Sequence, residues 1–248
     1  IEYAETRKAT LRPIGTVGQS GKLPMVKDDF RCSAPTESRS SLGAVGYGVQ
    51  GTRPETAVGC SRLQRYTDRW VQWGAVELKH LVQYLHTTRS WTLKFSHLGE
   101  NWEDLWLSIY ADAGECGNDD ELGRPGRAMS GYFLVLEGAN ETYLPLCWQA
   151  RRQTVPTSSS GEAECIAWAV AVKAGMRMAV MLELCRHTHP SVRGFVDNEA
   201  LRISVLHGNS KAMGHLKKQA NICFDTLRST LIVPTHISGD RNTADLMT

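Results

Sequence analysis

Four acidic residues stand where carboxylates are expected to do chemistry rather than to solvate a surface. Asp112 and Asp197 each follow a short run with strand periodicity, so each is expected at the end of a strand. Glu164 lies in the first turns of an apolar helix, and Asp245 opens a further helix. Because strand ends and helix starts can converge on one edge of a sheet, we expect these four side chains to meet.

Four converging carboxylates repel one another, since two unit charges about 4 Å apart cost on the order of 4 kcal/mol at an effective dielectric near 20. No lysine or arginine stands immediately beside all four. A pair of divalent cations is the usual compensation, and hard oxygen ligands select Mg²⁺ or Mn²⁺ over Zn²⁺. Two such ions ~3.5–4 Å apart activate a water molecule and stabilise the leaving oxygen of a phosphodiester. The sequence therefore predicts a two-metal hydrolytic site.

Each of these residues also has a structural interpretation when it is taken alone. Asp112 could be a turn residue that ends a strand, and Asp197 with Asn198 could cap the next helix. Glu164 could complement the helix dipole, although Glu162 is better placed for that role and only one of the two can face the sheet edge. The occurrence of all four carboxylates in this chain order favours the metal site.

The residues around the four carboxylates predict a mixed sheet with helices. Strand periodicity covers 105–111, 131–136, 143–148, 192–196 and 231–237, and helical periodicity covers 161–186, 198–206 and 216–228. The helix at 161–186 is apolar on nearly all sides, which is typical of a core element. Upstream, helices are expected between residues 41 and 86, and residues 1–40 have the Pro- and Gly-rich composition of an extended arm.

Composition excludes several classes of protein. The chain has 248 residues, of which 42% are hydrophobic and 22% charged, with a formal net charge of +2. These values indicate a globular protein and exclude a disordered, collagen-like or coiled-coil chain. No stretch approaches the ~18–20 uninterrupted apolar residues of a membrane span, and no signal-peptide pattern is seen. The seven cysteines include no C-x-x-C pair, so we expect reduced thiols in an intracellular setting.

The sequences around these carboxylates resemble the ribonuclease H domain of copia-type long-terminal-repeat retrotransposons. The family writes its second motif as a Ser/Thr run followed by E-A-E-Y-I-A, and residues 158–167 read S-S-S-G-E-A-E-C-I-A. Its third motif, C-D-N-x-x-A, is similar to V-D-N-E-A-L at 196–201, and its last, A-D-(I/L)-x-T, to A-D-L-M-T at 244–248. Upstream, G-T-R-P-E-T-A at 51–57 is similar to the family's G-T-R-P-D-I-A. The resemblance extends over residues 41–248.

This resemblance implies a domain organisation. Residues 101–248 would form an α/β, ribonuclease H-like domain, with a mixed five-stranded sheet and helices on both faces. Residues 41–100 would be the helical tail of a reverse transcriptase, similar to its thumb or connection, and residues 1–40 an extended or partial segment. The chain lacks the polymerase Y-x-D-D sequence, so we do not expect it to synthesise DNA.

The resemblance also implies an activity, a cofactor and partners. Asp112, Glu164, Asp197 and Asp245 would be the catalytic carboxylates and would hold two Mg²⁺ ions, with Mn²⁺ as a possible substitute. The reaction would be endonucleolytic hydrolysis of the RNA strand of RNA/DNA hybrids by one part of a retrotransposon polyprotein. The remainder of that polyprotein would be a partner, no membrane would be involved, and the location would be a cytoplasmic virus-like particle or the nucleus.

Hybrid binding would depend on phosphate contacts for affinity and on 2′-hydroxyl contacts for selectivity. The residues expected to touch the sugar or phosphate are Ser159, Ser160, Asn198, Arg152, Lys217 and Lys218. For the basic residues, a solvated surface charge is an equally good interpretation when each is taken singly. His236 lies within a predicted strand, so we expect it to be structural rather than to transfer protons.

The first motif departs from the family and supports an alternative function. The family usually has D-A-D-W-A-G there, whereas residues 112–117 read D-A-G-E-C-G, so that its second Asp and its Trp are missing. The alternative is a catalytically silent ribonuclease H-like module that binds nucleic acid or has a structural role. A transposase or integrase of the same superfold is a weaker alternative, since those enzymes place their Glu last in chain order.

Overall fold

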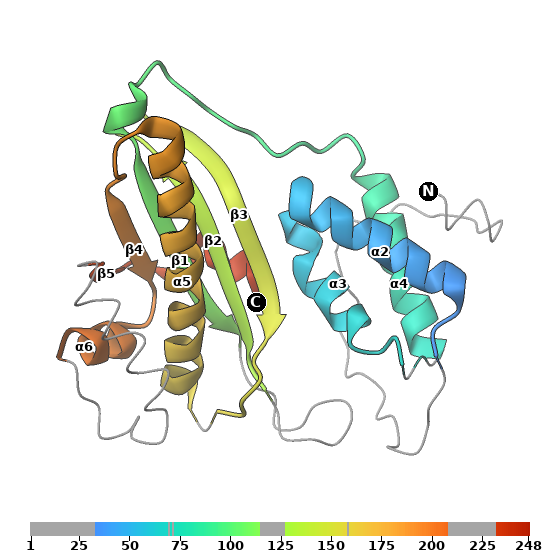
Figure 1. Cartoon of the computed structure of the whole chain (residues 1–248). Coiled ribbons are helices and arrows are strands. Elements are labelled where there is room, and N and C mark those ends of the chain that lie inside the picture. Colours follow the sequence, from blue (N-terminus) through green and yellow to red (C-terminus); the bar gives the residue numbers. More distant parts are fainter. Residues whose placement is uncertain (1–32, 69, 71, 115–126, 158, 208–231) are drawn as a thin grey trace. The chain divides into compact units, whose positions relative to one another are not determined.

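The computed structural model describes residues 33–68, 70, 72–114, 127–157, 159–207 and 232–248. The described residues fall into two compact units (Figure 1). The first comprises the residues up to Leu93, and the second comprises those from Lys94 onward.

The first unit is helical. Its elements are α2 (Thr36–Gly51), η1 (Pro54–Thr56), α3 (Ala57–Gln64) and α4 (Gln72–Thr87). Leu78, Leu81 and Val82 are buried on α4 at spacings of three and four, which is the apolar stripe of a helix that packs on its neighbours. Helix α2 starts before residue 41, where the helical pattern is predicted to begin. Residues 36–40 are all polar, so no apolar periodicity marks this first turn, although Ser38 is buried in it.

The second unit is built on a five-stranded sheet. Its strands are β1 (Trp106–Gly114), β2 (Met129–Glu137), β3 (Tyr143–Arg152), β4 (Val192–Val196) and β5 (Pro234–His236). Their order in the sheet is β3-β2-β1-β4-β5. The first three strands are antiparallel neighbours, whereas β4 runs parallel to both β1 and β5. The antiparallel part follows from the short connection between β2 and β3, and the parallel part requires crossover connections.

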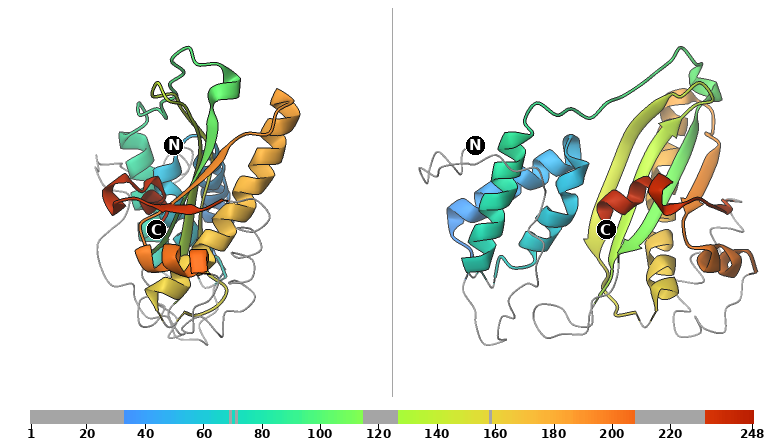
Figure 2. Two further views of the ribbon diagram at one scale, coloured as in Figure 1. Left: turned by 90° about the vertical axis from the view of Figure 1, so that its left-hand side faces the viewer. Right: turned by 180° about the vertical axis from the view of Figure 1, so that it is seen from behind.

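Helices cover both faces of this sheet. Helix α5 (Ser160–Arg186) packs on β1 and β2 from one side, and α6 (Glu199–His207) contacts α5 and β5. The short helix η5 (Thr243–Met247) packs on β1 and β2 from the opposite side, as the view from behind in Figure 2 shows. This mixed five-stranded sheet with helices on both faces, preceded by a helical segment, confirms the predicted ribonuclease H-like fold class.

Two glycines allow these helices to approach the sheet closely. A Cβ atom at Gly175 in α5 would overlap the side chain of Ile109 in β1. On the other face, a Cβ atom at Gly131 in β2 would lie 2.6 Å from the Cβ of Met247 in η5. Such separations are too short for real contacts, so both helices depend on the absence of a side chain at these positions.

Helix α5 lies at the centre of the core of the second unit. Trp168, Ala171 and Val172 are almost completely buried and belong to the same cluster as Ile109 and Leu134 of the sheet. By length and composition, α5 is long and apolar enough to cross a membrane, but half of its most apolar window is buried inside the protein. Packing against the sheet therefore explains the apolar character of its buried face, whereas Val180, Met181 and Leu184 are exposed.

Several element boundaries differ from those predicted. Strand β1 continues to Gly114 and β3 to Arg152, because both pair with β2 along its full length. Asp112 therefore lies inside its strand, whereas the pattern predicts that it lies at the end of the strand. Asp245 belongs to a 3₁₀ helix, whereas the pattern predicts the start of an α-helix. The helix predicted at 216–228 lies outside the described residues.

Candidate metal centre

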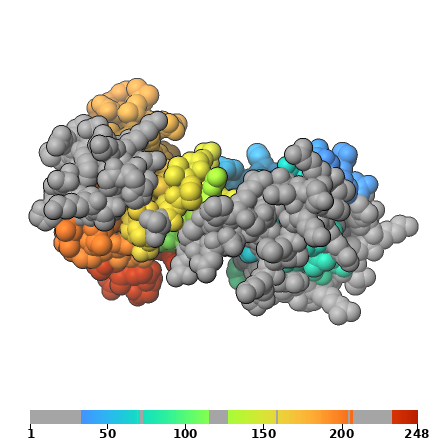
Figure 3. Space-filling view, turned by 90° about the horizontal axis from the view of Figure 1, so that it is seen from below, coloured from blue at the N-terminus to red at the C-terminus, as the bar shows by residue number. Residues whose placement is uncertain are grey.

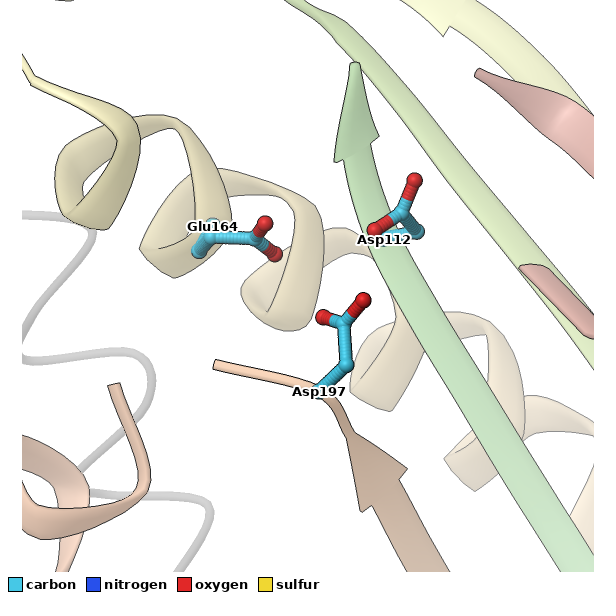
Figure 4. A group of neighbouring side chains, drawn as sticks. All are labelled: Asp112, Glu164 and Asp197. Atoms are coloured by element: carbon cyan, nitrogen blue, oxygen red, sulfur yellow. The ribbon is translucent and has the colours of Figure 1, made fainter. Parts of the chain in front are cut away.

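Two neighbouring parallel strands bring Asp112 and Asp197 to the same edge of the sheet. Tyr110 of β1 pairs with Phe195 of β4, and each aspartate follows two residues later on its chain. The third carboxylate, Glu164, comes from α5, which crosses above this edge. One oxygen from each of the three groups lies within 4.8 Å of the others, and the side chains point toward one another (Figure 4).

The start of α5 determines which glutamate joins this group. Ser159 caps the helix by accepting a hydrogen bond from the backbone N–H of Glu162 at 3.3 Å. Glu162 therefore lies in the first turn, and Glu164 lies two residues further, on a different side of the helix. Both are buried, but only Glu164 belongs to the carboxylate group, in agreement with the prediction that one of the two faces the sheet edge.

The surroundings of Asp112 and Glu164 disfavour the ionised form of both carboxyl groups. Burial raises the pKa of Glu164 to about 8, and the charges of Asp112 and Asp197 contribute to the rise. Burial also raises the pKa of Asp112, to which the charges of Asp197 and Asp245 add. The hydroxyl of Thr248 donates a hydrogen bond to Asp112 and works in the opposite direction. Among the residues that the structure describes, no lysine or arginine contributes to the shift of the Glu164 pKa.

These observations test whether a divalent cation fits the site. The Oε2 atom of Glu164 is buried and has no hydrogen-bond partner among the described residues. A buried carboxylate oxygen without a partner is costly, and a cation bound between the three groups would remove that cost. All the donors are carboxylate oxygens, which suit Mg²⁺ or Mn²⁺. The residues present therefore fit the predicted metal.

Asp245 lies beside this group without belonging to it. It is exposed on η5, and it is not among the residues whose oxygens lie within 4.8 Å of one another. Its charge nevertheless contributes to the raised pKa of Asp112. The structure thus brings three of the four predicted carboxylates together and puts the fourth within electrostatic reach of them.

The residues predicted to bind substrate have different surroundings. Ser159 and Ser160 are exposed at the start of α5, and Arg152 is half-buried at the end of β3. Asn198 caps α6, with its Oδ1 atom accepting the backbone N–H of Leu201 at 2.9 Å. Figure 3, which views the molecule from below, shows the surface of the second unit that contains β3 (yellow), α6 (orange) and residues 232–248 (red). Lys217 and Lys218 lie outside the described residues.

His236 contacts the site through the backbone. Its Nε2 atom lies 3.0 Å from the carbonyl oxygen of Asp197, and the residue is in β5 beside Val196 of β4. Because a carbonyl oxygen only accepts, the imidazole donates this hydrogen bond. The contact joins the exposed side chain of His236 to the backbone of Asp197, and its structural role stays a prediction.

Sequence reasoning missed three residues that contact the site or its supporting backbone: Thr248, Asn242 and Gln153. Thr248 ends the A-D-L-M-T sequence, which marks its place but not its hydrogen bond to Asp112. Asn242 precedes a predicted helix start, where a capping residue is expected. Nothing in the pattern around Gln153 indicates that its side chain is buried.

No family model matches the chain. Among curated proteins, it is 26% identical over 141 residues to the secreted RxLR effector protein 161 of Plasmopara viticola, over 57% of this chain and 90% of that protein. Among solved structures, it is similar to RNase H1 of the archaeon Halobacterium salinarum, with 15% identity, a TM-score of 0.39, and coverage of 56% of this chain and 89% of that chain.

Two further solved structures have comparable similarity. LC11-RNase H1, isolated from compost, is 19% identical with a TM-score of 0.42, over 57% of this chain and 91% of that chain. A mutant protease–reverse transcriptase of prototype foamy virus is 13% identical with a TM-score of 0.41, over 73% of this chain and 26% of that chain. Because these TM-scores are below 0.5, the assignment of the fold depends on the strand order and the helices of the chain itself.

Proposed function

We propose that this chain hydrolyses the RNA strand of RNA/DNA hybrids in a metal-dependent reaction, as the ribonuclease H part of a copia-type retrotransposon polyprotein. The observation that carries the proposal is the group of Asp112, Glu164 and Asp197, whose oxygens lie within 4.8 Å of one another. The retrotransposon assignment is supported by the sequence motifs around Glu164, Asp197 and Asp245, which occur in the family's order.

The proposed chemistry assigns a role to each side chain of the group. Divalent cations, when bound, would activate the attacking water and stabilise the leaving oxygen of the phosphodiester. Asp112 and Asp197 are fixed by two paired strands and would form the rigid side of the site. Glu164 would approach from α5, and its unpartnered oxygen would complete the binding of a cation. Thr248 would orient Asp112 by donating to one of its oxygens.

Hybrid recognition would use groups close to these carboxylates. Ser159 and Ser160 are exposed five and four residues before Glu164. The Oγ atom of Ser159 accepts a hydrogen bond in the cap of α5, so its O–H would be the donor to a phosphate, and Ser160 would offer its hydroxyl to a phosphate or a 2′-hydroxyl. The Oδ1 atom of Asn198 is engaged in the cap of α6, which leaves its amide nitrogen as the donor for substrate. Arg152 would add a charged contact to the phosphate backbone.

The test is hydrolysis of a labelled RNA/DNA hybrid in Mg²⁺ by the purified chain and by Asp197→Asn. The variant keeps the shape of the side chain but removes a charge that a cation needs. We expect its rate to fall by about a hundredfold or more, since even outer-shell partners of a metal are worth about 10–100-fold. The matched control is Glu103→Gln, which removes an exposed charge in η2 (Trp102–Asp104), outside the carboxylate group. Equal cleavage by wild type and Asp197→Asn would refute the proposal.

The position of Asp245 supports a second candidate function. Since this residue is exposed and outside the group of three, the site has fewer gathered carboxylates than the predicted four. The second candidate is a catalytically silent module that binds nucleic acid or has a structural role. A calorimetric titration with Mg²⁺ separates the two, because a silent module would give no saturable heat of binding, whereas the proposed nuclease would.

A further inference from the structure

Gln153 joins the sheet to the turn of α5 that carries Glu164. Its side chain is buried, with 4% of the residue exposed, just after the end of β3. Its Nε2 atom donates to the hydroxyl of Ser130 in β2 at 2.9 Å and to the carbonyl oxygen of Ala163 at 2.8 Å. Ala163 immediately precedes Glu164, so one amide group connects the backbone beside this carboxylate to the sheet.

Asn242 makes the corresponding connection on the opposite face of the sheet. It is also buried, with 4% exposed, directly before η5. Its Nδ2 atom donates to the carbonyl oxygen of Ala111 at 3.0 Å, and its Oδ1 atom accepts the backbone N–H of Ala244 at 3.2 Å. Ala111 immediately precedes Asp112, and Ala244 immediately precedes Asp245. This amide therefore bridges the backbones beside two acidic residues that are far apart in the sequence.

We infer that Gln153 and Asn242 are positioning residues that set the distances between carboxylates carried on different elements. The inference deepens the proposed function and depends on the same metal site. Carboxylate oxygens within 4.8 Å of one another repel, so without other contacts α5 and η5 would tend to move away from the sheet edge. Each amide opposes this displacement with hydrogen bonds to the backbone next to a carboxylate.

Burial makes these hydrogen bonds effective. An amide in a dry site is held in one orientation, because leaving its donors unpaired is costly. The position of the backbone at Ala163, Ala111 and Ala244 is therefore fixed more tightly than packing alone would fix it. A bound cation needs ligand oxygens at defined separations, so small shifts of these backbones would weaken its binding.

Asn242→Ser tests the second bridge with little change at the helix start. Serine keeps the capping oxygen for Ala244 but is too short to donate to the carbonyl of Ala111. We expect the dissociation constant for Mn²⁺, measured by calorimetry on the full 248-residue chain, to rise about tenfold. The turnover rate on the hybrid should fall, whereas the KM for the hybrid should stay within about twofold of wild type, since no substrate contact is removed.

Gln153→Met tests the first bridge. Methionine has similar length and volume but cannot donate, so Ser130 and the carbonyl of Ala163 lose their partner. The same rise in the Mn²⁺ dissociation constant is expected. The control is Thr142→Val, which removes a buried hydroxyl that accepts the backbone N–H of Leu98 at 3.2 Å, in the turn between β2 and β3. It should lower the melting temperature without changing the affinity for Mn²⁺.

A double variant shows whether Asn242 acts through Asp245. If it does, Asn242→Ser should weaken Mn²⁺ binding by less than about twofold in an Asp245→Asn background, because the carboxylate through which it acts is already neutral. A full tenfold effect in that background would exclude this route. If both single variants bind Mn²⁺ like wild type and differ only in melting temperature, the residues are merely structural and the inference is wrong.

The same titrations separate this inference from the proposed function. If wild type binds Mn²⁺ but cleaves no hybrid, the proposed function fails, and the variants still decide whether the amides position the carboxylates. If wild type cleaves hybrids and the variants keep its metal affinity, only the inference fails. A wild-type chain that takes up no Mn²⁺ would overturn both.

Discussion

Glu164 is a carboxyl group whose charge the fold disfavours. Its pKa is raised by burial from the ordinary value of 4.5 to about 8, and two neighbouring aspartates add to the rise. Between these pH values the folded protein holds a proton that the unfolded chain has released, so the folded state loses stability as the pH increases. The stabilising contribution is complete below about pH 4.5 and is lost by the time the pH passes about 8.

We therefore expect the melting temperature of the metal-free protein to fall as the pH is raised from about 4.5 to about 8. Adding Mg²⁺ should raise it again, and by more at the upper end of this range, because the cation binds the ionised carboxylates. Differential scanning fluorimetry over a pH series measures both effects. Glu164→Gln cannot ionise and should flatten most of the slope; Asp112, whose pKa is also raised, would account for what remains. If the melting temperature of Glu164→Gln falls with pH as steeply as that of wild type, Glu164 is not the group responsible for the pH dependence.

Asp245 should be less important than the three gathered carboxylates. It is exposed and acts on the site through its charge on Asp112. We expect Asp245→Asn to weaken Mn²⁺ binding about tenfold, whereas Asp197→Asn should weaken it by about a hundredfold or more. Calorimetric titration of both variants measures the difference. Equal losses would mean that Asp245 is a direct ligand in the metal-bound state.

At the residue scale, the sequence predicted the acidic residues of the site but not the side chains that form hydrogen bonds to them or to the backbone beside them. Asp112, Glu164 and Asp197 are recognisable because an acid directly after or within an apolar element is unusual. Gln153 and Thr248 have no such signature, since a polar residue near the end of an element is expected at the surface. Their contacts depend on how α5 and η5 lie against the sheet. That arrangement is set by tertiary packing and cannot be read from local pattern.

At the scale of elements, the contact between α5 and β1 depends on Gly175. A Cβ atom there would overlap Ile109, so Gly175→Ala should force α5 away from the sheet and cost about 1–3 kcal/mol of stability. Gly43→Ala is the matched control, because Gly43 is also helical but has no atom within 4 Å of the added Cβ. It should be neutral or stabilising by up to about 1 kcal/mol, from helix propensity alone. Urea denaturation of both variants measures the change in the free energy of unfolding. Equal changes in the two variants would show that the close approach of α5 to β1 is unimportant.

The boundaries of the elements were predictable where they depend on local pattern. Strand β4 has the predicted bounds, 192–196, and α5 starts within one residue of the predicted position, because a serine cap precedes its apolar run. Strand β1 was not fully predictable. It continues beyond residue 111 through pairing of Asp112 with Gly131 and of Gly114 with Met129. An acid and a glycine normally end a strand, but a paired partner strand extends it.

At the scale of the whole molecule, the four candidate carboxylates, Asp112, Glu164, Asp197 and Asp245, belong to the second unit, which has a hydrophobic core of its own. The first unit has separate buried residues, among them Leu78, which is completely buried on α4. Since large-to-small changes act through the cavity that they leave, their effects should stay within the unit that carries them. Stability and metal binding should therefore be separable by mutation.

Leu78→Ala and Leu134→Ala test this separation, since both remove a leucine side chain that is completely buried. Each should cost about 2–5 kcal/mol within its own unit. Leu134 lies in β2, in the same cluster as Ile109 and Trp168 beneath α5, so its loss should also weaken Mn²⁺ binding. Leu78→Ala should leave the Mn²⁺ dissociation constant within about twofold of wild type. If Leu78→Ala weakens metal binding as strongly as Leu134→Ala does, the two units do not act independently, and the helical unit contributes to the site.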